Sequence, residues 1–300
     1  MFLFLGIIAG FLIPFQTSFN THLGKKKQST LLAVITSFTI GLCLTTSLTL
    51  VRGESIFPNI PDITSVMIAA ILGVIFVSGS VIVFAKLGAT QTAILPVIGQ
   101  ITAGLIIDHF GLLNAVQSPV TATKLLGTFF VLLGVIGVVL SNRQKNASNA
   151  TQHQNTLLLQ ILGVCLGAFT TIQTALNSHI GVTLHSPFLS THLNFLFGLM
   201  ILLLLATLKK EHFANLYTKS SPWWSYLGGL IGFIFVLSTI MITPVITTSV
   251  TVLTTLLGLT MGSITIDTFG LFNTPKKALT LQKIVSLVIL IGGVTMTHFL

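Results

Sequence analysis

The sequence predicts an all-α membrane protein with ten transmembrane helices, arranged as two inverted five-helix repeats. Three observations support this fold class: a composition with very few charges, a motif that occurs twice, and an uneven distribution of basic residues between the loops. Hydrophobic residues make up 52% of the 300 residues and charged residues only 6%. Soluble domains carry roughly 25% charged residues, so this composition excludes an ordinary soluble protein.

Long apolar runs define the expected helices. In lipid, only helices and closed barrels satisfy the backbone, and runs of about 20 apolar residues indicate helices. We expect ten helices, at residues 3–23, 31–51, 64–85, 89–107, 124–141, 157–180, 188–208, 224–243, 247–266 and 281–299. The first run lacks the basic start of a signal peptide and leads directly into Lys25, Lys26 and Lys27, so we interpret it as a transmembrane helix.

One stretch of the sequence occurs twice. Residues 6–24 (GIIAGFLIPFQTSFNTHLG) reappear 157 positions later as residues 163–181 (GVCLGAFTTIQTALNSHIG), with seven of nineteen positions identical. DHFGLLN at 108–114 matches DTFGLFN at 267–273 with an offset of 159. We therefore divide the chain into a first repeat (1–143), a polar linker (144–156) and a second repeat (157–300).

Basic residues predict the orientation of the helices. The loops after the odd-numbered spans carry twelve Lys and Arg residues, whereas the other loops carry only Arg52 and Lys124. Short basic loops stay in the cytoplasm, so the linker is expected there and both termini outside. Five spans per repeat turn the second copy upside down, as inverted repeats require. The net charge of +9 thus follows from topology and does not point to a nucleic-acid partner.

Motifs of soluble catalysis are missing from the sequence. It contains no Walker A loop, zinc-ligand spacing, nucleophile elbow or dinucleotide fingerprint. Cys43 and Cys165 fall inside predicted spans, so neither a disulfide nor a metal site is expected. We expect a non-enzymatic protein without cofactor or metal. Its expected partners are the lipid bilayer and a small-molecule substrate.

Four amides are the leading candidates for substrate binding. Gln16 and Asn20 lie one helical turn apart on a stripe of small and polar residues, and Gln173 and Asn177 repeat this arrangement in the sixth span. Lipid would exclude such a stripe, so it should face protein or a water-filled path. Two interpretations remain open: a pseudo-symmetric substrate site near the bilayer midplane, or hydrogen bonds that hold the helices together.

Two prolines single out individual helices. Pro14 removes a backbone hydrogen bond beside Gln16 and should kink the first helix. Pro96 interrupts the fourth span in the same way, one turn before Gln100, which becomes a further candidate for substrate binding. The equivalent residues of the second repeat are not proline, so both kinks are specific to the first repeat.

Two aspartates are tied to the repeat. Asp108 and Asp267 each end the fourth helix of a repeat, where the helix dipole disfavours an acid, so each needs a compensating partner. We favour a structural role, with hydrogen bonds from the following turn or pairing with the duplicated Lys124 and Lys283. Proton coupling is the alternative role for both carboxylates.

These motifs resemble the YdcZ family, a branch of the drug/metabolite transporter superfamily. The matching residues are Gly6, Gly10, Gln16, Asn20, Leu23, Gly24, Gly99, Gln100, Asp108, His109, Phe110 and Gly111 in the first half, and Gly163, Gly167, Gln173, Asn177, Ile180, Gly181, Asp267, Phe269 and Gly270 in the second. The resemblance implies an inner-membrane transporter that works by alternating access and exports a small metabolite or drug. Leu259 and Thr268 depart from the pattern, which favours Gln100 as a contact present in one half only.

The sequence leaves three functional hypotheses. Neither opening span contains Asp or Glu, which favours a neutral or zwitterionic solute over a permanent cation. The alternatives are proton-coupled drug or cation efflux through Asp108, and a non-transporting membrane scaffold or subunit. Fusion of the two units lets the chain close its own interface, which is compatible with a monomer.

Overall fold

The computed structural model describes residues 1–60, 62–141, 156–216, 221–273, 276 and 278–299, although most side chains between residues 77 and 94 lie outside this description. Every regular element in these residues is helical. The α-helices are α1 (Phe2–Lys27), α2 (Thr30–Val51), α3 (Ile63–Phe110), α4 (Ala122–Ser141), α5 (Thr156–Thr183), α6 (Pro187–Leu208), α7 (Gly228–Ile246), α8 (Thr248–Phe269) and α9 (Leu281–Phe299). Short 3₁₀ turns are η1 (Leu112–Asn114), η2 (Phe213–Leu216), η3 (Trp223–Leu227) and η4 (Leu271–Asn273).

The helices agree with the predicted membrane spans. Within the described residues, seven helices are long and apolar enough to cross a bilayer, and three shorter apolar stretches lie at Ile63–Phe76, Leu95–Phe110 and Leu281–Thr297. The protein is therefore an all-α, multi-pass membrane protein. The predicted linker at 144–156 lies outside the described residues except for its last position, so the boundary between the repeats stays a prediction.

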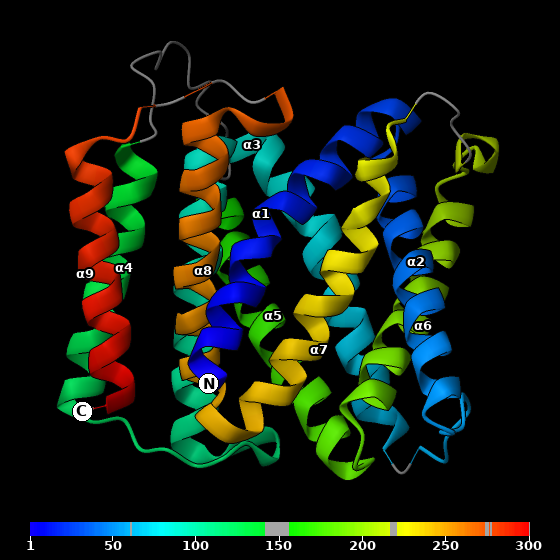
Figure 1. Cartoon of the computed structure of the whole chain (residues 1–300), viewed down its shortest axis with the longest axis horizontal. Coiled ribbons are helices and arrows are strands. Elements are labelled where there is room, and N and C mark those ends of the chain that lie inside the picture. The colour runs from blue at the N-terminus through cyan, green and yellow to red at the C-terminus, as the bar shows by residue number, and fades with distance from the viewer. Residues whose placement is uncertain (61, 142–155, 217–220, 274–275, 277, 300) are drawn as a thin grey trace.

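The third and fourth predicted spans lie within one element, α3, whose helical assignment runs from Ile63 to Phe110. Along α3, Gly73 faces Gln173 and Gly79 faces Leu166, so the first part runs antiparallel to α5. Farther along, Leu95 faces Gly163 and Gln100 contacts Thr170, so the last part runs parallel to α5. The two parts of α3 therefore run in opposite directions, as the two predicted spans require (Figure 1).

In the second repeat the helical assignment is interrupted between the third and fourth helices, and a proline lies at this interruption. The connection between α7 and α8 falls at Thr247, whose φ of 73° ends the helix. Pro244 lies just before it and removes a backbone donor, whereas the equivalent residue of the first repeat is Ala85, which keeps its N–H.

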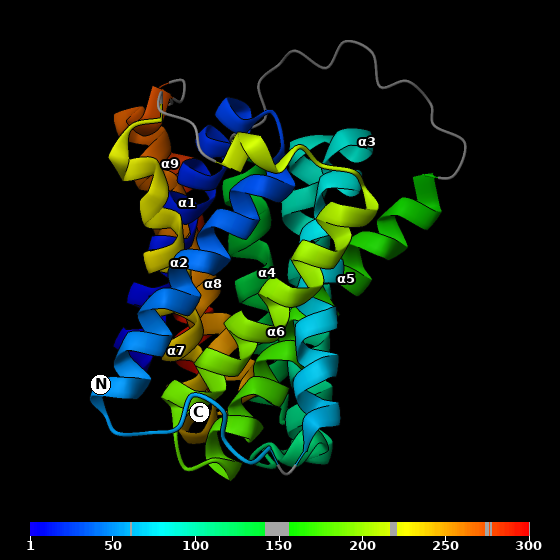
Figure 2. The same cartoon turned by 90° about the vertical axis from the view of Figure 1, so that its right-hand side faces the viewer.

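Both termini lie at the same end of the molecule. In Figures 1 and 2 the two chain ends lie low in the view, while α1, α4, α6 and α8 end at the top. The lysines that close α1 and the residues that follow α6 and α8 are therefore at the opposite end from the termini. We call this the basic end, defined by Lys25–Lys27, Lys209, Lys210 and Lys276.

The two halves pack around an approximate twofold axis. The opening helix α1 packs against α7 and α8, which are the third and fourth helices of the second half. The other opening helix, α5, packs against both parts of α3, which are their equivalents in the first half. The pairs α2 with α6 and α4 with α9 each bring equivalent helices together. Because α1 and α5 run in opposite directions in Figure 1, the repeats are inverted.

Glycines allow the closest of these helix crossings. A Cβ atom at Gly10 would overlap the carbonyl oxygen of Thr255, and one at Gly167 would overlap that of Pro96. Gly10 and Gly167 are 157 positions apart, and Pro96 and Thr255 are 159 apart, so these two crossings are the same contact in the two halves. Small residues at such crossings bring helix backbones together and gain van der Waals contact.

Local backbone conformations repeat with the same offsets. Ser29 and Ser186 cap α2 and α6, and their hydroxyl oxygens accept hydrogen bonds from the N–H groups of Leu32 and Leu189 at 3.3 and 3.2 Å. Left-handed residues occur at equivalent positions in both halves: Gln28 and His185, Gly53 and Lys210, Gly111 and Gly270, and Leu113 and Phe272. The duplicated sequence thus produces duplicated caps and turns.

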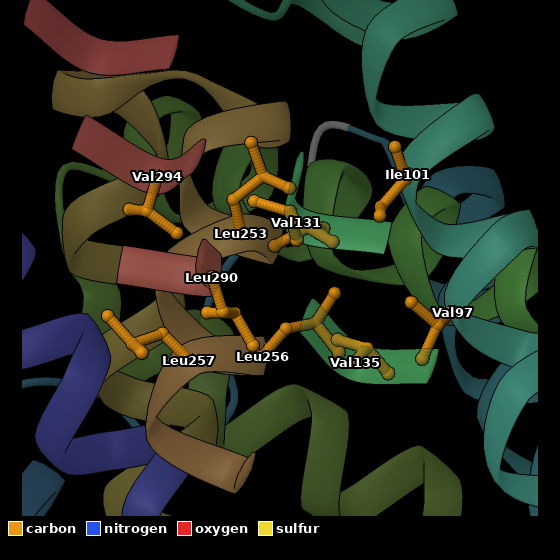
Figure 3. Close-up of a cluster of buried hydrophobic side chains, with 10 residues drawn as sticks. Val97, Ile101, Val131, Val135, Leu253, Leu256, Leu257, Leu290 and Val294 are labelled. Carbon is orange, nitrogen blue, oxygen red and sulfur yellow. The ribbon is translucent and has the colours of Figure 1, made fainter. Parts of the chain in front are cut away.

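One apolar core lies between the outer helix pair and the rest of the protein. Figure 3 shows Val97 and Ile101 of α3 facing Val131 and Val135 of α4, with leucines of α8 and α9 completing the cluster. Its buried members are Val97, Ile101, Val131, Val135, Val252, Leu253, Leu256, Leu257, Leu290 and Val294. Apolar packing thus holds α4 and α9 in place.

Candidate functional site

The first amide cluster consists of Gln16, Asn20 and Ser37. The hydroxyl of Ser37, on α2, donates to Asn20 Oδ1 at 2.6 Å. Asn20 Oδ1 also lies against Gly228, and Gln16 Nε2 lies against Gly232, where a side chain would collide with the amide. Both glycines belong to α7, so the cluster is built by helices of both halves.

The second amide cluster consists of Gln173, Asn177 and Asn194. Asn194 Oδ1, on α6, accepts from Gln173 Nε2 at 3.2 Å and from Asn177 Nδ2 at 3.0 Å. Gln173 also lies against Gly73 of α3, and Ser190 Oγ donates to the backbone carbonyl of Asn177 at 2.5 Å. Asn177 and Asn194 are buried.

The two clusters are symmetry equivalents. Ser37 and Asn194 are separated by 157 positions and Gly73 and Gly232 by 159, the same offsets as in the sequence motifs. The sequence leaves open a pseudo-symmetric substrate site or hydrogen bonds between helices, and the amides form two clusters, each with its own hydrogen bonds. Each opening helix packs against the third and fourth helices of the other half.

Gln100 is held at a third position. Its Nε2 donates to Thr170 Oγ1 of α5 at 3.2 Å, and its backbone carbonyl accepts from Thr171 Oγ1 at 3.2 Å. Both threonines lie one turn or less from Gln173 on α5, so Gln100 borders the second amide cluster. The first cluster lacks this neighbour because Leu259 replaces the glutamine there.

The two prolines lie inside continuous helices. Pro14 is within α1 and Pro96 within α3, and the carbonyl of Pro14 accepts from Ser18 Oγ at 2.8 Å. The carbonyl of Pro96 faces Gly167, at the crossing of α3 with α5. The kink expected at each proline stays a prediction.

Asp108 caps a helix of the opposite half. Its side chain is fully buried and accepts from the N–H groups of Thr248 and Ser249 at 2.9 and 2.7 Å, and from the Ser249 hydroxyl. These groups begin α8, where the helix dipole favours a negative charge. The partners expected from the sequence were the following turn or Lys124. The hydrogen bonds to the carboxylate come from the first turn of α8, and Lys124 is close enough for a Coulombic interaction with Asp108.

The lysines duplicated with the aspartates bind backbone carbonyls. Lys124 Nζ donates to the hydroxyl and carbonyl of Ser118 at 3.0 and 3.4 Å, and Lys283 Nζ donates to the carbonyl of Ala278 at 3.2 Å. Both side chains are buried. Each lysine thus holds the segment between the fourth and fifth helices of its repeat. Within the described residues, no ion pair joins Asp267 to Lys283.

The second helix of each repeat supplies site residues that are not among the candidates from the sequence. Ser37 and Asn194 are the hydrogen-bond partners of the duplicated amides. Because Ser37 and Asn194 are different residue types, comparing the two repeats for identical residues does not find them. The available signal was that two polar residues occupy equivalent positions, 157 apart, in otherwise apolar spans.

The clusters offer neutral hydrogen-bonding groups. Their side chains are amides and hydroxyls, and no described carboxylate or ammonium group belongs to either cluster. Within the described part of the chain, no three His, Cys, Asp or Glu side chains gather as metal ligands would. Such groups can orient a polar solute without balancing a charge.

Inverted repeats with paired polar clusters inside an apolar helical bundle define a membrane transporter. A family model described as "Putative inner membrane exporter, YdcZ" matches residues 1–137 and 158–296, and the chain belongs to this family. The resemblance noted from the sequence is thereby confirmed. The two matched segments separate the chain into two copies of the family's unit.

Comparison with solved structures supports the fold. A crystal structure titled "Crystal structure of protein" superposes with a TM-score of 0.70 at 13% sequence identity, covering 98% of this chain and 94% of that chain. No curated protein matches the sequence.

Proposed function

We propose that the chain is a secondary-active exporter that moves a small neutral or zwitterionic solute across the inner membrane by alternating access. The observation that carries this proposal is the pair of amide clusters, which are equivalent under the inverted symmetry. Substrate sites of inverted-repeat transporters lie at the interface between the repeats. Both clusters meet this condition, because Gln16 faces α7 and Gln173 faces α3 of the other half.

The charge of the clusters supports a substrate without net charge. A buried cation would need a carboxylate nearby, and Asp108, the acid closest in sequence to Gln100, is engaged at the first turn of α8. A neutral or zwitterionic solute can instead exchange hydrogen bonds with amides. Gln173, Asn177 and Gln100 are the residues we assign to substrate contact in the second cluster, and Gln16 and Asn20 in the first.

The engagement of Asp108 also argues against proton-coupled drug efflux through this residue. Protonation would remove an acceptor that serves two backbone N–H groups and a hydroxyl at once. A non-transporting scaffold is the second alternative, and counterflow of any solute through the purified protein would exclude it.

Transport is tested directly with purified protein in liposomes. Vesicles loaded with unlabelled solute and diluted into the labelled form accumulate label by counterflow if the protein carries that solute. The probes are a panel of zwitterionic amino acids and neutral polyols, with tetraphenylphosphonium as the permanent cation. We expect counterflow for a member of the first two groups and none for the cation.

Matched variants connect this activity to the clusters. Gln173→Leu removes an amide of the second cluster and should reduce counterflow at least about tenfold, the effect of losing a well-placed hydrogen bond. Gly292→Ala is the control. Gly292 lies on an open surface of α9 with no atom near the added methyl group, so this substitution should leave counterflow unchanged. Counterflow of the cation alone, or of no probe, would contradict the proposal.

A further inference from the structure

We propose that His22 is a proton-binding site that controls closure of the basic end. This inference rests on the proposed alternating-access function, because it assigns a trigger to one of the two gates. Its support comes from an aromatic assembly that exists at the basic end alone, and from the unpartnered nitrogen of the histidine within it.

Four aromatic rings from three elements meet at the basic end. We call Phe15 and Phe19 of α1, Trp224 of η3 and Phe272 of η4 the aromatic cap. The ring centroid of Phe272 lies 4.8 Å from that of Phe19, 5.6 Å from Trp224 and 5.8 Å from Phe15. Phe19 and Trp224 are 5.4 Å apart. The cap thus connects the end of α1 with two segments of the second half.

His22 lies against this cap. Its ring centroid is 4.8 Å from that of Trp224, and its Nε2 atom is buried without a hydrogen-bond partner. A protonated imidazole needs an acceptor or water at each nitrogen, and burying a charged N–H without one is far costlier than burying a neutral nitrogen. The closed cap therefore favours the neutral ring, and proton binding favours a state in which water reaches Nε2.

The opposite end contains the equivalent histidine in a different setting. His179 Nε2 is 3.2 Å from Asn114 Nδ2, and the ring lines a small pocket whose rim includes Asp62. Hydrogen bonds from the Ser65 hydroxyl and N–H hold the pKa of Asp62 below its usual value, so an anion is available near His179. His22 has no such neighbour.

The cap itself is absent from that end. The positions equivalent to its four rings are Ile172, Leu176, Ser65 and Leu113. None of these is aromatic. The two histidines are therefore duplicated in sequence, but within the described residues His22 lies against an aromatic ring and His179 does not.

Few titratable groups surround His22. The elements that pack against α1 are α2, α7, α8 and η3, and Phe272 of η4 also contacts it. Neither α7 nor η4 contains a titratable residue, and α2 contains only Cys43, α8 only Asp267 and η3 only Tyr226. On α1 itself, Lys25–Lys27 follow within two turns and add positive charge, and Lys276 follows η4. In the described residues no ion pair includes His22. Among these side-chain types, the imidazole is the one that changes charge between roughly pH 5 and 8.

Tryptophan fluorescence tests this proposal without any transported solute. Trp223→Phe leaves Trp224 as the single tryptophan, since the chain contains two. The full-length protein in detergent is excited at a wavelength selective for tryptophan, and collisional quenching by neutral acrylamide is measured between pH 8 and pH 5. As the pH falls, we expect a red shift and an increase of about twofold in the quenching constant, in one transition typical of a histidine.

Three variants in the Trp223→Phe background identify the group that titrates. His22→Gln removes the ionisable ring, and His22→Phe keeps an aromatic ring against Trp224 in case the glutamine variant does not fold. Both should abolish the pH-dependent change in quenching. His179→Gln is the matched control from the second half and should retain it.

Two results would overturn the proposal. One is an unchanged pH transition in both His22 variants. The other is a loss of Trp224 emission at low pH with a constant acrylamide quenching constant, because a protonated ring that merely quenches its neighbour does not open the cap. Neither result depends on counterflow, so failure of the gate and failure of the exporter function are distinguished.

Discussion

Asp108 shows how this protein keeps a full charge within an apolar bundle. The carboxylate lies at the end of α3, where its own helix dipole is unfavourable, and it is stabilised by the first turn of α8. The structural role favoured from the sequence is compatible with this geometry, whereas the partner was not foreseeable, because it is 140 residues away in the chain. Sequence motifs define which residue needs a partner, and tertiary packing decides which partner it finds.

Substituting this carboxylate should lower stability. Asp108→Asn turns one acceptor oxygen into a donor that faces N–H groups, so we expect a loss of about 1–3 kcal/mol and a lower unfolding temperature in detergent. Glu211→Gln is the control, since Glu211 follows the end of α6 and belongs to no ion pair of the described residues. Equal unfolding temperatures for Asp108→Asn and the wild type would contradict the capping role.

The same transport assay separates the two roles considered for Asp108. If the residue is a cap, the Asp108→Asn protein that remains folded should keep the pH dependence of counterflow. A shift of that dependence in Asp108→Asn would instead assign proton coupling to the carboxylate.

Asn194 is the acceptor on which the second amide cluster depends. Asn194→Leu leaves the Gln173 and Asn177 side-chain amides without their common acceptor, and we expect a cost of about 1–2 kcal/mol, measured as a lower unfolding temperature in detergent. Ser37→Ala removes only one hydrogen bond from the first cluster and should cost less. A larger effect of Ser37→Ala would show that the clusters are not organised as described.

At the scale of elements, glycine positions decide how closely the halves approach. Gly10→Ala and Gly167→Ala would each push a methyl group into a backbone carbonyl of the other half, and backbone cannot move aside as a side chain can. We expect each to destabilise the protein by about 1–3 kcal/mol. Gly292→Ala, with open space around its Cβ, should be neutral or slightly stabilising, because alanine favours the helix. Thermal unfolding of the three variants side by side tests this, and equal values would contradict it.

The elements themselves were largely predictable, since apolar length marks each span. The expected helix at 31–51 occurs at Thr30–Val51 and that at 188–208 occurs at Pro187–Leu208. The third and fourth predicted spans share one assigned element, α3, but its two parts run in opposite directions against α5, as two separate spans would. The start of the eighth span, predicted at residue 224, is a 3₁₀ turn that carries Trp224 of the aromatic cap.

At the scale of the whole molecule, the orientation in the membrane is the property to test. With Cys43 and Cys165 replaced by serine, single cysteines at Gln28 and Glu211 should react with a membrane-impermeant maleimide only after the cytoplasmic side is exposed. Cysteines at Ser55 and Ser118 should react from outside. The physical reason is the retention of basic loops in the cytoplasm. Labelling of all four positions from one side would contradict the inverted arrangement.

The candidate site was predictable in composition and not in layout. The duplicated motif predicts the four amides Gln16, Asn20, Gln173 and Asn177. Their partners Ser37 and Asn194 could have been found as polar residues at equivalent positions of the two repeats. What periodicity could not provide was the choice of neighbours, since α1 packs against α7 and α8, and α5 against α3, rather than against each other. Helix periodicity defines which face is polar, but the pairing of faces depends on long-range packing.

Phe38 and Phe195 have a special place in this molecule. They are equivalent residues, 157 positions apart, and their rings meet edge to face with centroids 5.2 Å apart. Each ring lies against a glycine of the opposite helix, Gly198 and Gly41. The symmetry axis therefore passes between the two rings. Exchanging the two halves carries this ring pair onto itself, whereas the contact of Gly10 with Thr255 is carried onto that of Gly167 with Pro96. A contact of the first kind can be kept in both conformations of an inverted repeat.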